Sequence, residues 1–291
     1  MDFELKNSLN NFLQDIYSNF NTQFHNDVII LLAIGFLRSK NLSWHQSFSI
    51  AKKAVSENCF FQNYIECITC SVGCSDFLKV FLEKNSKHFD NIIVVTAPED
   101  NDSIQVAKNY GANVLITDIF YKDGKKFDRG SAYNKALELL KYKSWVCFID
   151  VDIILDDNHR QSILKFGLDK NVFYGIDRLN VITDEDRNSL INGNPFKFHI
   201  YCEHEWGFGY YQMFSMNHPT IMQKFINKEI IYPSANDVVF SDFLFRQQFG
   251  PGYMDETSKW IWDSRFQKKL PVKCYHIGTN GAGSKSLTIK Y

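Results

Sequence analysis

Asp150 and Asp152 are the side chains of this sequence best placed for chemistry, because they directly follow an apolar run at residues 145–149. Such a run predicts a buried strand, and the carboxyl ends of parallel strands open on the crevice where α/β sheets bind ligands. Two carboxylates at this edge suit Mg²⁺ or Mn²⁺, which would bridge the phosphates of a nucleotide and neutralise charge on a departing diphosphate. The competing interpretation is a pair of solvated or helix-capping aspartates.

The D-x-D spacing alone is a weak signal. The chain carries 22 aspartates, and this number gives about two such pairs by chance. It has three, at 100/102, 150/152 and 184/186. Only the pair at 150/152 ends an apolar run, so its position distinguishes it from the other two.

Short β-rich runs alternate with amphipathic helices from residue 65 onward, which is typical of βαβ units and a mostly parallel sheet. The pattern predicts strands at residues 65–72, 91–96, 113–117 and 145–150. It predicts helices between them at residues 76–85, 103–110 and 131–140. Four strands with three crossovers form half of a doubly wound α/β domain. Residues 158–291 are less regular and rich in aromatic side chains, with a helix predicted at about 235–249.

Residues 1–62 are predicted to form a helical module of their own. Apolar side chains recur there at helical spacing, at Leu9, Phe12, Leu13, Ile16 and Phe20. A capping box, Ser43-x-x-Gln46, opens a further helix that runs to residue 55. Two lysines near its end, Lys52 and Lys53, leave DNA docking open beside a plain packing role.

Composition and charge narrow the class of protein. The chain has 291 residues, of which 45% are hydrophobic and 22% charged, as in a folded globule. A net charge of −1 excludes a globally basic nucleic-acid coat. The longest apolar run, residues 28–37, is about half as long as a membrane-crossing helix, so no membrane span is expected. Seven cysteines and the lack of a secretory signal favour free thiols and a cytoplasmic location. Cys67 and Cys70 lie in one predicted strand and are expected on its opposite faces.

Three segments follow one another in a characteristic order and spacing. They are the run from His88 to Ser103 that contains Thr96 and Asp100, the stretch Phe127-Asp-Arg129-Gly130 with Asn134, and Phe148-Ile-Asp150-x-Asp152. Together they resemble a GT-A fold nucleotide-sugar glycosyltransferase of the family 2 type, over residues 65–280. The resemblance implies a Rossmann-like α/β domain at residues 63–291, with a nucleotide-sugar-binding half at 63–157 and an acceptor-side half at 158–291. Residues 1–62 lie outside it as a small helical extension.

The resemblance also implies roles on the donor side. Thr96, Asp100 and Ser103 would hold the nucleobase and ribose, while Arg129 and Asn134 would contact the diphosphate. Asp150 would bind both donor and metal, and Asp152 the metal. For Asp100 the alternative is a cap of the helix that begins near Ser103, and for Arg129 it is a surface charge.

On the acceptor side, Asp242 resembles the catalytic base of inverting family members, with Asp237 as the fallback. In Cys274-Tyr-His276-Ile-Gly278, the imidazole of His276 resembles a third metal ligand. The family often continues with Asn-Trp, whereas Gly281 follows Asn280 here, so the metal role of His276 stays open.

We therefore expect a metal-dependent inverting glycosyltransferase that moves a sugar from a nucleotide diphosphate to an acceptor hydroxyl. Mn²⁺ or Mg²⁺ would be its cofactor, and a UDP-sugar is the favoured donor. One alternative glycosylates a modified DNA base, with residues 1–62 docking the DNA. A second is a nucleotidyltransferase, although the loop Gly73-Cys-Ser-Asp76 lacks the lysine and glycines of a phosphate loop. A third is a non-catalytic sugar-binding protein.

Overall fold

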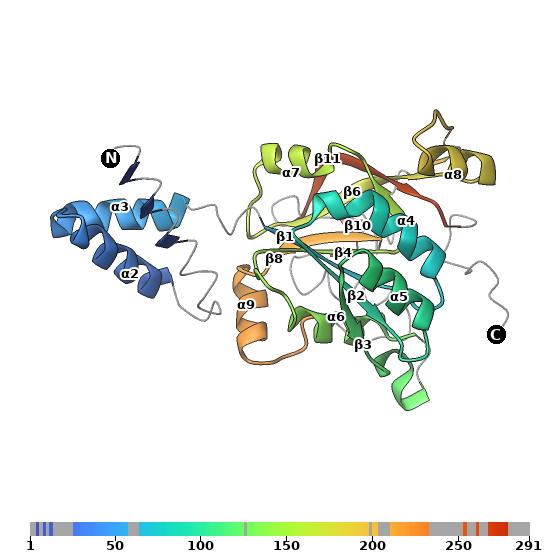
Figure 1. Ribbon diagram of the computed structural model, residues 1–291, viewed down its shortest axis with the longest axis horizontal. Helices are drawn as coiled ribbons and strands as arrows, with labels where there is room; N and C mark the ends of the chain where they lie inside the picture. Colours follow the sequence, from blue (N-terminus) through green and yellow to red (C-terminus); the bar gives the residue numbers. More distant parts are fainter. Residues whose placement is uncertain are drawn as a thin grey trace. The chain divides into compact units, whose positions relative to one another are not determined.

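The computed structural model describes residues 4–5, 8–9, 12–13, 26–57, 64–124, 127–197, 200–202, 210–232, 253–254, 260–261 and 267–278. The chain divides into two compact units, Met1–Tyr64 and Ile65–Tyr291 (Figure 1). Each unit is described by itself.

The first unit is helical. Its described helices are α2 (Asn26–Ser39) and α3 (Trp44–Glu57). The predicted capping box at the start of α3 is confirmed: the Gln46 amide donates to Ser43 Oγ at 3.3 Å, and the Ser43 amide donates to Gln46 Oε1 at 3.1 Å. These bonds satisfy backbone donors that the first helical turn leaves unpaired. The small core of this unit contains Leu9, Leu13, Ala33, Leu37 and Ala51.

The second unit is built on one mixed sheet, with nine strands among the described residues. These strands are β1 (Ile65–Cys70), β2 (Asn91–Thr96), β3 (Asn113–Ile116), β4 (Trp145–Ile149), β5 (Ile153–Leu155), β6 (Phe173–Asn180), β7 (Ile200–Cys202), β8 (Tyr211–Ser215) and β11 (Gln267–His276). The order is β3-β2-β1-β4-β8-β6-β11-β5, and β7 pairs with β6. A separate hairpin joins β9 (Tyr253–Met254) to β10 (Trp260–Ile261).

The strands of the first half all run in one direction, whereas those of the second half run in both. The four strands β3, β2, β1 and β4 are parallel, as the βαβ pattern predicts. Beyond them β8 is antiparallel to both β4 and β6, β11 is parallel to β6, and β5 is antiparallel to β11. The nucleotide-binding half therefore has the expected parallel order, and the second half adds strands of both directions.

Helices cover both faces of the sheet, so the α/β, doubly wound class is confirmed. The helices of this unit are α4 (Ser75–Asn85), α5 (Asn101–Asn109), α6 (Arg129–Leu137), α7 (His159–Phe166), α8 (Asp184–Ile191) and α9 (Pro219–Ile226), with short 3₁₀ turns at Ser86–His88 and Ile119–Gly124. Side chains from α4, α5 and α7 pack in the core of one face. Side chains from α6 and α9 pack in the core of the other.

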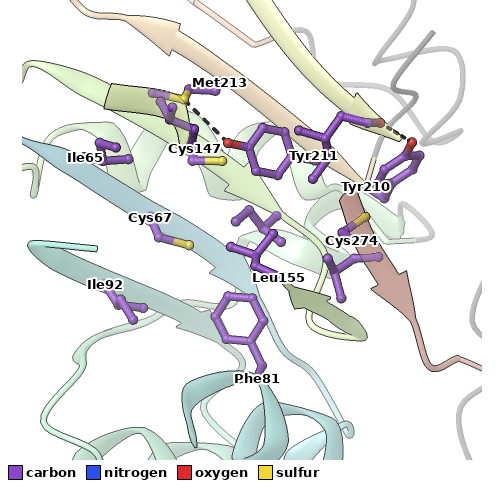
Figure 2. Packing of buried hydrophobic residues seen from close by; sticks show 14 of the residues in the cluster. Ile65, Cys67, Phe81, Ile92, Cys147, Leu155, Tyr210, Tyr211, Met213 and Cys274 are labelled. Atoms are coloured by element: carbon purple, nitrogen blue, oxygen red, sulfur yellow. Dashed lines mark hydrogen bonds between the residues drawn. The ribbon is translucent and has the colours of Figure 1, made fainter. Parts of the chain in front are cut away.

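Alternation along the strands supplies both cores, and Figure 2 shows the core that packs against α4. Cys67 of β1 lies in the α4 core, whereas Cys70 packs against the α6 core, so their predicted opposite orientation is confirmed. The cysteines that the structure describes are free thiols, as expected; they are Cys67, Cys70, Cys74, Cys147 and Cys274.

In the described part of the chain, no helix is both long and apolar enough to cross a membrane.

Two helices begin earlier than the hydrophobic pattern predicts. Asp100 caps α5, because its Oδ1 accepts from the Ser103 amide at 3.1 Å, and Asp128 caps α6 by accepting from the Ser131 amide at 3.0 Å. Each cap lies three residues before the predicted start of its helix, at residue 103 or 131, and so extends the helix toward the sheet edge. The consequence for the site is that Arg129 becomes the first residue of α6.

A buried carboxylate fixes the turn before β4. Glu66 is fully buried and accepts from the backbone amides of Lys141, Tyr142 and Lys143 at 2.8–2.9 Å. It also accepts from Asn91 Nδ2 at 2.7 Å. These bonds tie β1 and β2 to the start of β4. They thereby help to fix the position of Asp150, which follows the last residue of β4.

His88 and His159 are both buried in the core on the α7 side of the sheet. Their rings lie 5.5 Å apart, and His159 Nε2 is 3.1 Å from the Tyr211 hydroxyl. Burial lowers the pKa of His159 to about 3 and that of His88 to about 4. The folded chain therefore holds both rings neutral at a pH where the unfolded chain protonates them.

This difference predicts an acid-labile fold. The unfolded chain binds more protons below pH 6.5, so the free energy of unfolding falls as the pH drops from about 6.5 toward 3. His159 alone should lower it by about 2 kcal/mol between pH 7 and pH 5. Urea unfolding at the two pH values measures this, and His159→Asn should reduce the difference while the exposed control His45→Asn retains it. An unchanged difference in His159→Asn would show that His159 does not contribute.

Candidate active site

Asp152 and His276 meet at one edge of the sheet. Asp152 stands in the turn between β4 and β5, and His276 ends β11, which pairs with β5 so that His276 lies opposite Ile153. The Ile277 amide donates to the Asp152 carbonyl at 2.9 Å. The side chains face each other with Asp152 Oδ2 3.0 Å from His276 Nε2, and both are about nine-tenths buried.

Gly278 completes this arrangement. A Cβ atom at this position would lie 2.4 Å from Asp152 Oδ2 and 2.9 Å from His276 Nε2, closer than such contacts occur. The backbone therefore approaches the pair on the side where a side chain would otherwise project. The sequence motif contains Gly278 but does not reveal this contact, because it depends on how β11 is registered against β5.

Asp150 points to a different partner. Its Oδ1 forms an ion pair with Arg129 Nη1, and the Arg129 side chain is buried while that of Asp150 is one-third exposed. The guanidinium also lies over the Tyr133 ring, 5.4 Å from its centroid. The structure thus brings together two residues predicted to contact the donor, and Arg129 is not the surface charge of the alternative interpretation. Sequence reasoning missed the pairing because 21 residues separate the two side chains.

Removing Arg129 should destabilise the fold by leaving the Asp150 charge without its buried partner. Because Asp150 is partly solvated, we expect Arg129→Gln to lower the free energy of unfolding by about 2 kcal/mol, below the range for fully buried pairs. Lys87→Gln, which breaks the exposed Lys87–Asp157 pair, should change it by less than about 0.5 kcal/mol. Urea unfolding of both variants measures the contrast, and equal effects would contradict it.

The predicted nucleobase residues form a network among themselves. Asp100 Oδ2 accepts from the Gly73 amide at 2.7 Å and from the Thr96 hydroxyl at 3.2 Å, while its Oδ1 caps α5. Ser103 Oγ lies 3.1 Å from Ser71 Oγ. Asp100 therefore does cap a helix, as its alternative states, and it also fixes the loop after β1. Contact with a nucleobase stays a prediction for these residues.

Cys74 lies in the same loop, near the carboxylates of Asp152 and Asp100. Burial raises the pKa of its thiol, and the nearby charges of Asp152 and Asp100 raise it further. Near the ion pair, burial likewise raises the pKa of Cys70, with Arg129 opposing and Asp150 reinforcing the shift. Both thiols are held protonated, so neither is a reactive nucleophile or a ready metal ligand.

The side chain of Asn134 makes hydrogen bonds that connect α6 to residues 231–232. Its Oδ1 accepts from the amides of Ile231 and Tyr232 at 3.0 and 2.7 Å, and its Nδ2 donates to the carbonyls of Gly130 and Tyr232. An asparagine amide has two donors and two acceptor positions, and all four are used here. We therefore place Asn134 among the residues that position α6; the predicted contact with the diphosphate has no support in these hydrogen bonds.

The residues at this edge fit a hard divalent ion in part. Across the described ranges, no group of three His, Cys, Asp or Glu side chains converges on one metal position. Asp152 and His276 do converge, and Nδ1 of the buried His276 ring has no hydrogen-bond partner among the described residues. One carboxylate and one imidazole suit an ion that takes its remaining ligands from substrate phosphates and water. Asp150 as a third ligand stays a prediction, since its Oδ1 pairs with Arg129.

Several predicted residues lie outside the described ranges. These are the candidate base Asp242, its fallback Asp237, Asn280 with Gly281, and the helix at about 235–249. Their assignments stay predictions from the sequence.

No protein-family model matches the chain, and no curated protein matches it. Similar solved structures include a glucosyl-3-phosphoglycerate synthase from Mycobacterium tuberculosis in complex with Mn²⁺, UDP and glucosyl-3-phosphoglycerate, at 16% identity over 40% of this chain and 44% of that chain, with a TM-score of 0.31. The same enzyme in complex with UDP matches at 15% identity over 53% and 57%, with a TM-score of 0.35. A mannosyl-3-phosphoglycerate synthase from Rubrobacter xylanophilus matches at 20% identity over 42% of each chain, with a TM-score of 0.32. Each of these matches spans less than two thirds of the matched chain.

Proposed function

We propose that the chain is a metal-dependent inverting glycosyltransferase that moves a sugar from a nucleotide diphosphate donor to an acceptor hydroxyl. One observation carries the proposal: Asp152 and His276, 124 residues apart, meet at 3.0 Å at the edge where β4 ends. The loop after β1 and the N-terminus of α6 lie at this same end of the strands, where α/β sheets bind nucleotides.

Three groups of residues would act on the nucleotide-sugar donor. Asp152 and His276 would hold a divalent ion, which would neutralise the negative charge that develops on the leaving diphosphate. Arg129, fixed by Asp150 at the start of α6, presents a positive charge and helix amides on the same side. The loop that Asp100 ties to Thr96 and Gly73 supports the nucleobase and ribose.

The transfer itself is a single displacement at the sugar C1. The acceptor oxygen forms the new bond to C1 on the face opposite the diphosphate, and the C1–O bond to the diphosphate breaks with its electron pair going to the diphosphate. Asp242, within the late predicted helix, takes the proton of the acceptor hydroxyl. Residues 63–157 would thus hold the donor and residues 158–291 the acceptor.

Donor hydrolysis tests the class and the donor together. The chain is incubated with a panel of nucleotide sugars, UDP-sugars first, in Mn²⁺ and in chelator, and release of the nucleotide diphosphate is measured. We expect slow hydrolysis of one donor that chelator abolishes. Hydrolysis of none of the donors, or hydrolysis that chelator leaves unchanged, would contradict the proposal. Release of pyrophosphate from nucleoside triphosphates instead would favour the nucleotidyltransferase.

A further inference from the structure

We propose that Asn180 is a positioning residue of the metal site: its side-chain carbonyl accepts a hydrogen bond from His276 Nδ1 when Nε2 of that ring binds the cation. This inference rests on the proposed function and deepens it. It assigns a role to a residue that no sequence motif marks.

The strand register places the two side chains together. Asn180 ends β6 and His276 ends β11, and the two are partners in the parallel ladder. Partners on neighbouring parallel strands are about 4.8 Å apart and project from the same face of the sheet. The even-numbered positions of both strands share one face, because Tyr174 and Ile176 of β6 and Cys274 of β11 lie in the same core cluster. The Val181 amide donates to the His276 carbonyl at 3.0 Å and holds the two strand ends in place.

Each side chain carries an unsatisfied polar atom. Asn180 and His276 are both 5% exposed. Asn180 Oδ1 and His276 Nδ1 are buried without a hydrogen-bond partner among the described residues. A buried polar group without a partner is unfavourable, so two of them on neighbouring residues need a reason. One atom is an acceptor and the other is able to donate, so a hydrogen bond between them would satisfy both.

The cation determines when that bond is needed. Without the cation, His276 Nε2 lies 3.0 Å from Asp152 Oδ2, so a proton carried on Nε2 would point to the carboxylate. A metal ion requires the lone pair of Nε2, so the proton of a neutral ring must then be on Nδ1. A buried Nδ1–H needs an acceptor, and metal-bound histidines almost always have one, which fixes the ring and raises its basicity. Asn180 Oδ1 is placed to be this acceptor.

Mn²⁺ binding to the full chain without donor tests the assignment. The dissociation constant is measured by electron paramagnetic resonance of unbound Mn²⁺ for the wild type, Asn180→Leu, Asn180→Asp and His276→Ala. We expect Asn180→Leu, which keeps the size but loses the acceptor, to weaken binding about 10- to 100-fold. Asn180→Asp retains an acceptor and should bind within a fewfold of the wild type or more tightly. Asn217→Leu, at an exposed asparagine, should leave the constant unchanged.

A second measurement reports the proton itself. Nitrogen NMR of ¹⁵N-histidine-labelled chain with Zn²⁺, a diamagnetic ion, should show His276 protonated at Nδ1 in the wild type and Asn180→Asp, with an altered Nδ1–H signal in Asn180→Leu. If Asn180→Leu binds Mn²⁺ within twofold of the wild type while His276→Ala binds it weakly, the Asn180 assignment is wrong and the metal site stands. If His276→Ala also binds Mn²⁺ normally, the proposed metal site itself is wrong. Should Asn180→Leu fail to fold, Asn180→Ala, which also lacks the acceptor, and Asn180→Asp give the same contrast.

Discussion

Asp152→Asn is expected to lower Mn²⁺-dependent donor turnover about 10³-fold, since a metal ion contributes several kcal/mol to stabilising charge in the transition state. The amide keeps the size of the carboxylate but carries no charge, and it faces the His276 ring in a largely buried position. Mn²⁺ affinity should fall with turnover, whereas nucleotide binding in chelator should be retained. Steady-state hydrolysis of the donor found in the panel, together with Mn²⁺ titration, measures both.

The matched control for this variant is Asp102→Asn. Asp102 belongs to the D-x-D pair at 100/102 and lies exposed in the first turn of α5. Its replacement should leave turnover within about twofold of the wild type. Equal losses in the two variants, or a fully active Asp152→Asn, would remove the basis for placing the metal at Asp152.

Gly278→Ala should produce the second large effect, through a single methyl group. The added Cβ would lie 2.4 Å from Asp152 Oδ2 and 2.9 Å from His276 Nε2, so one or both ligands must move. Because ligand geometry governs metal affinity, we expect Mn²⁺ binding and turnover to fall at least about 10- to 100-fold. The far-ultraviolet circular dichroism spectrum should be unchanged, since the change lies beyond the last residue of β11.

Gly35→Ala provides the comparison, because a Cβ at Gly35 in α2 meets nothing within 4 Å. Alanine also favours helix over glycine, so this variant should be as stable as the wild type or more stable. Normal Mn²⁺ affinity in Gly278→Ala would mean that the Asp152–His276 pair tolerates the methyl group and that the observed proximity is not needed for binding.

Local pattern was sufficient for the first half of the fold. The strand at residues 91–96 has the predicted ends, and the strand before Asp150 begins at the predicted Trp145. Short buried strands flanked by polar turns carry their own signal in alternation and β-branched content, independent of distant contacts. The same local signal selected the pair at 150/152 from three candidates, and the structure places that pair at the sheet edge.

The partners of the site residues required tertiary information. Nothing local shows that Asp150 turns to Arg129 while Asp152 turns to His276, because a two-residue offset only places the carboxylates near each other. The polar role of Asn134 depends on residues 231–232, nearly 100 positions later. Short β5 was not predicted either, since three residues carry too little pattern.

The irregular pairing in β11 has a consequence for chain length. Between Lys269 and Lys273 the ladder advances by four residues on β11 but by only two on β6, from Gly175 to Asp177. The surplus is even, so inward and outward positions alternate without interruption up to His276. Deleting two residues between Lys269 and Lys273 would remove the surplus and keep His276 paired with Asn180 on the same face of the sheet, whereas deleting one would leave a single surplus residue and interrupt the alternation before His276. We therefore expect the loss of two residues in this segment to disturb the site less than the loss of one.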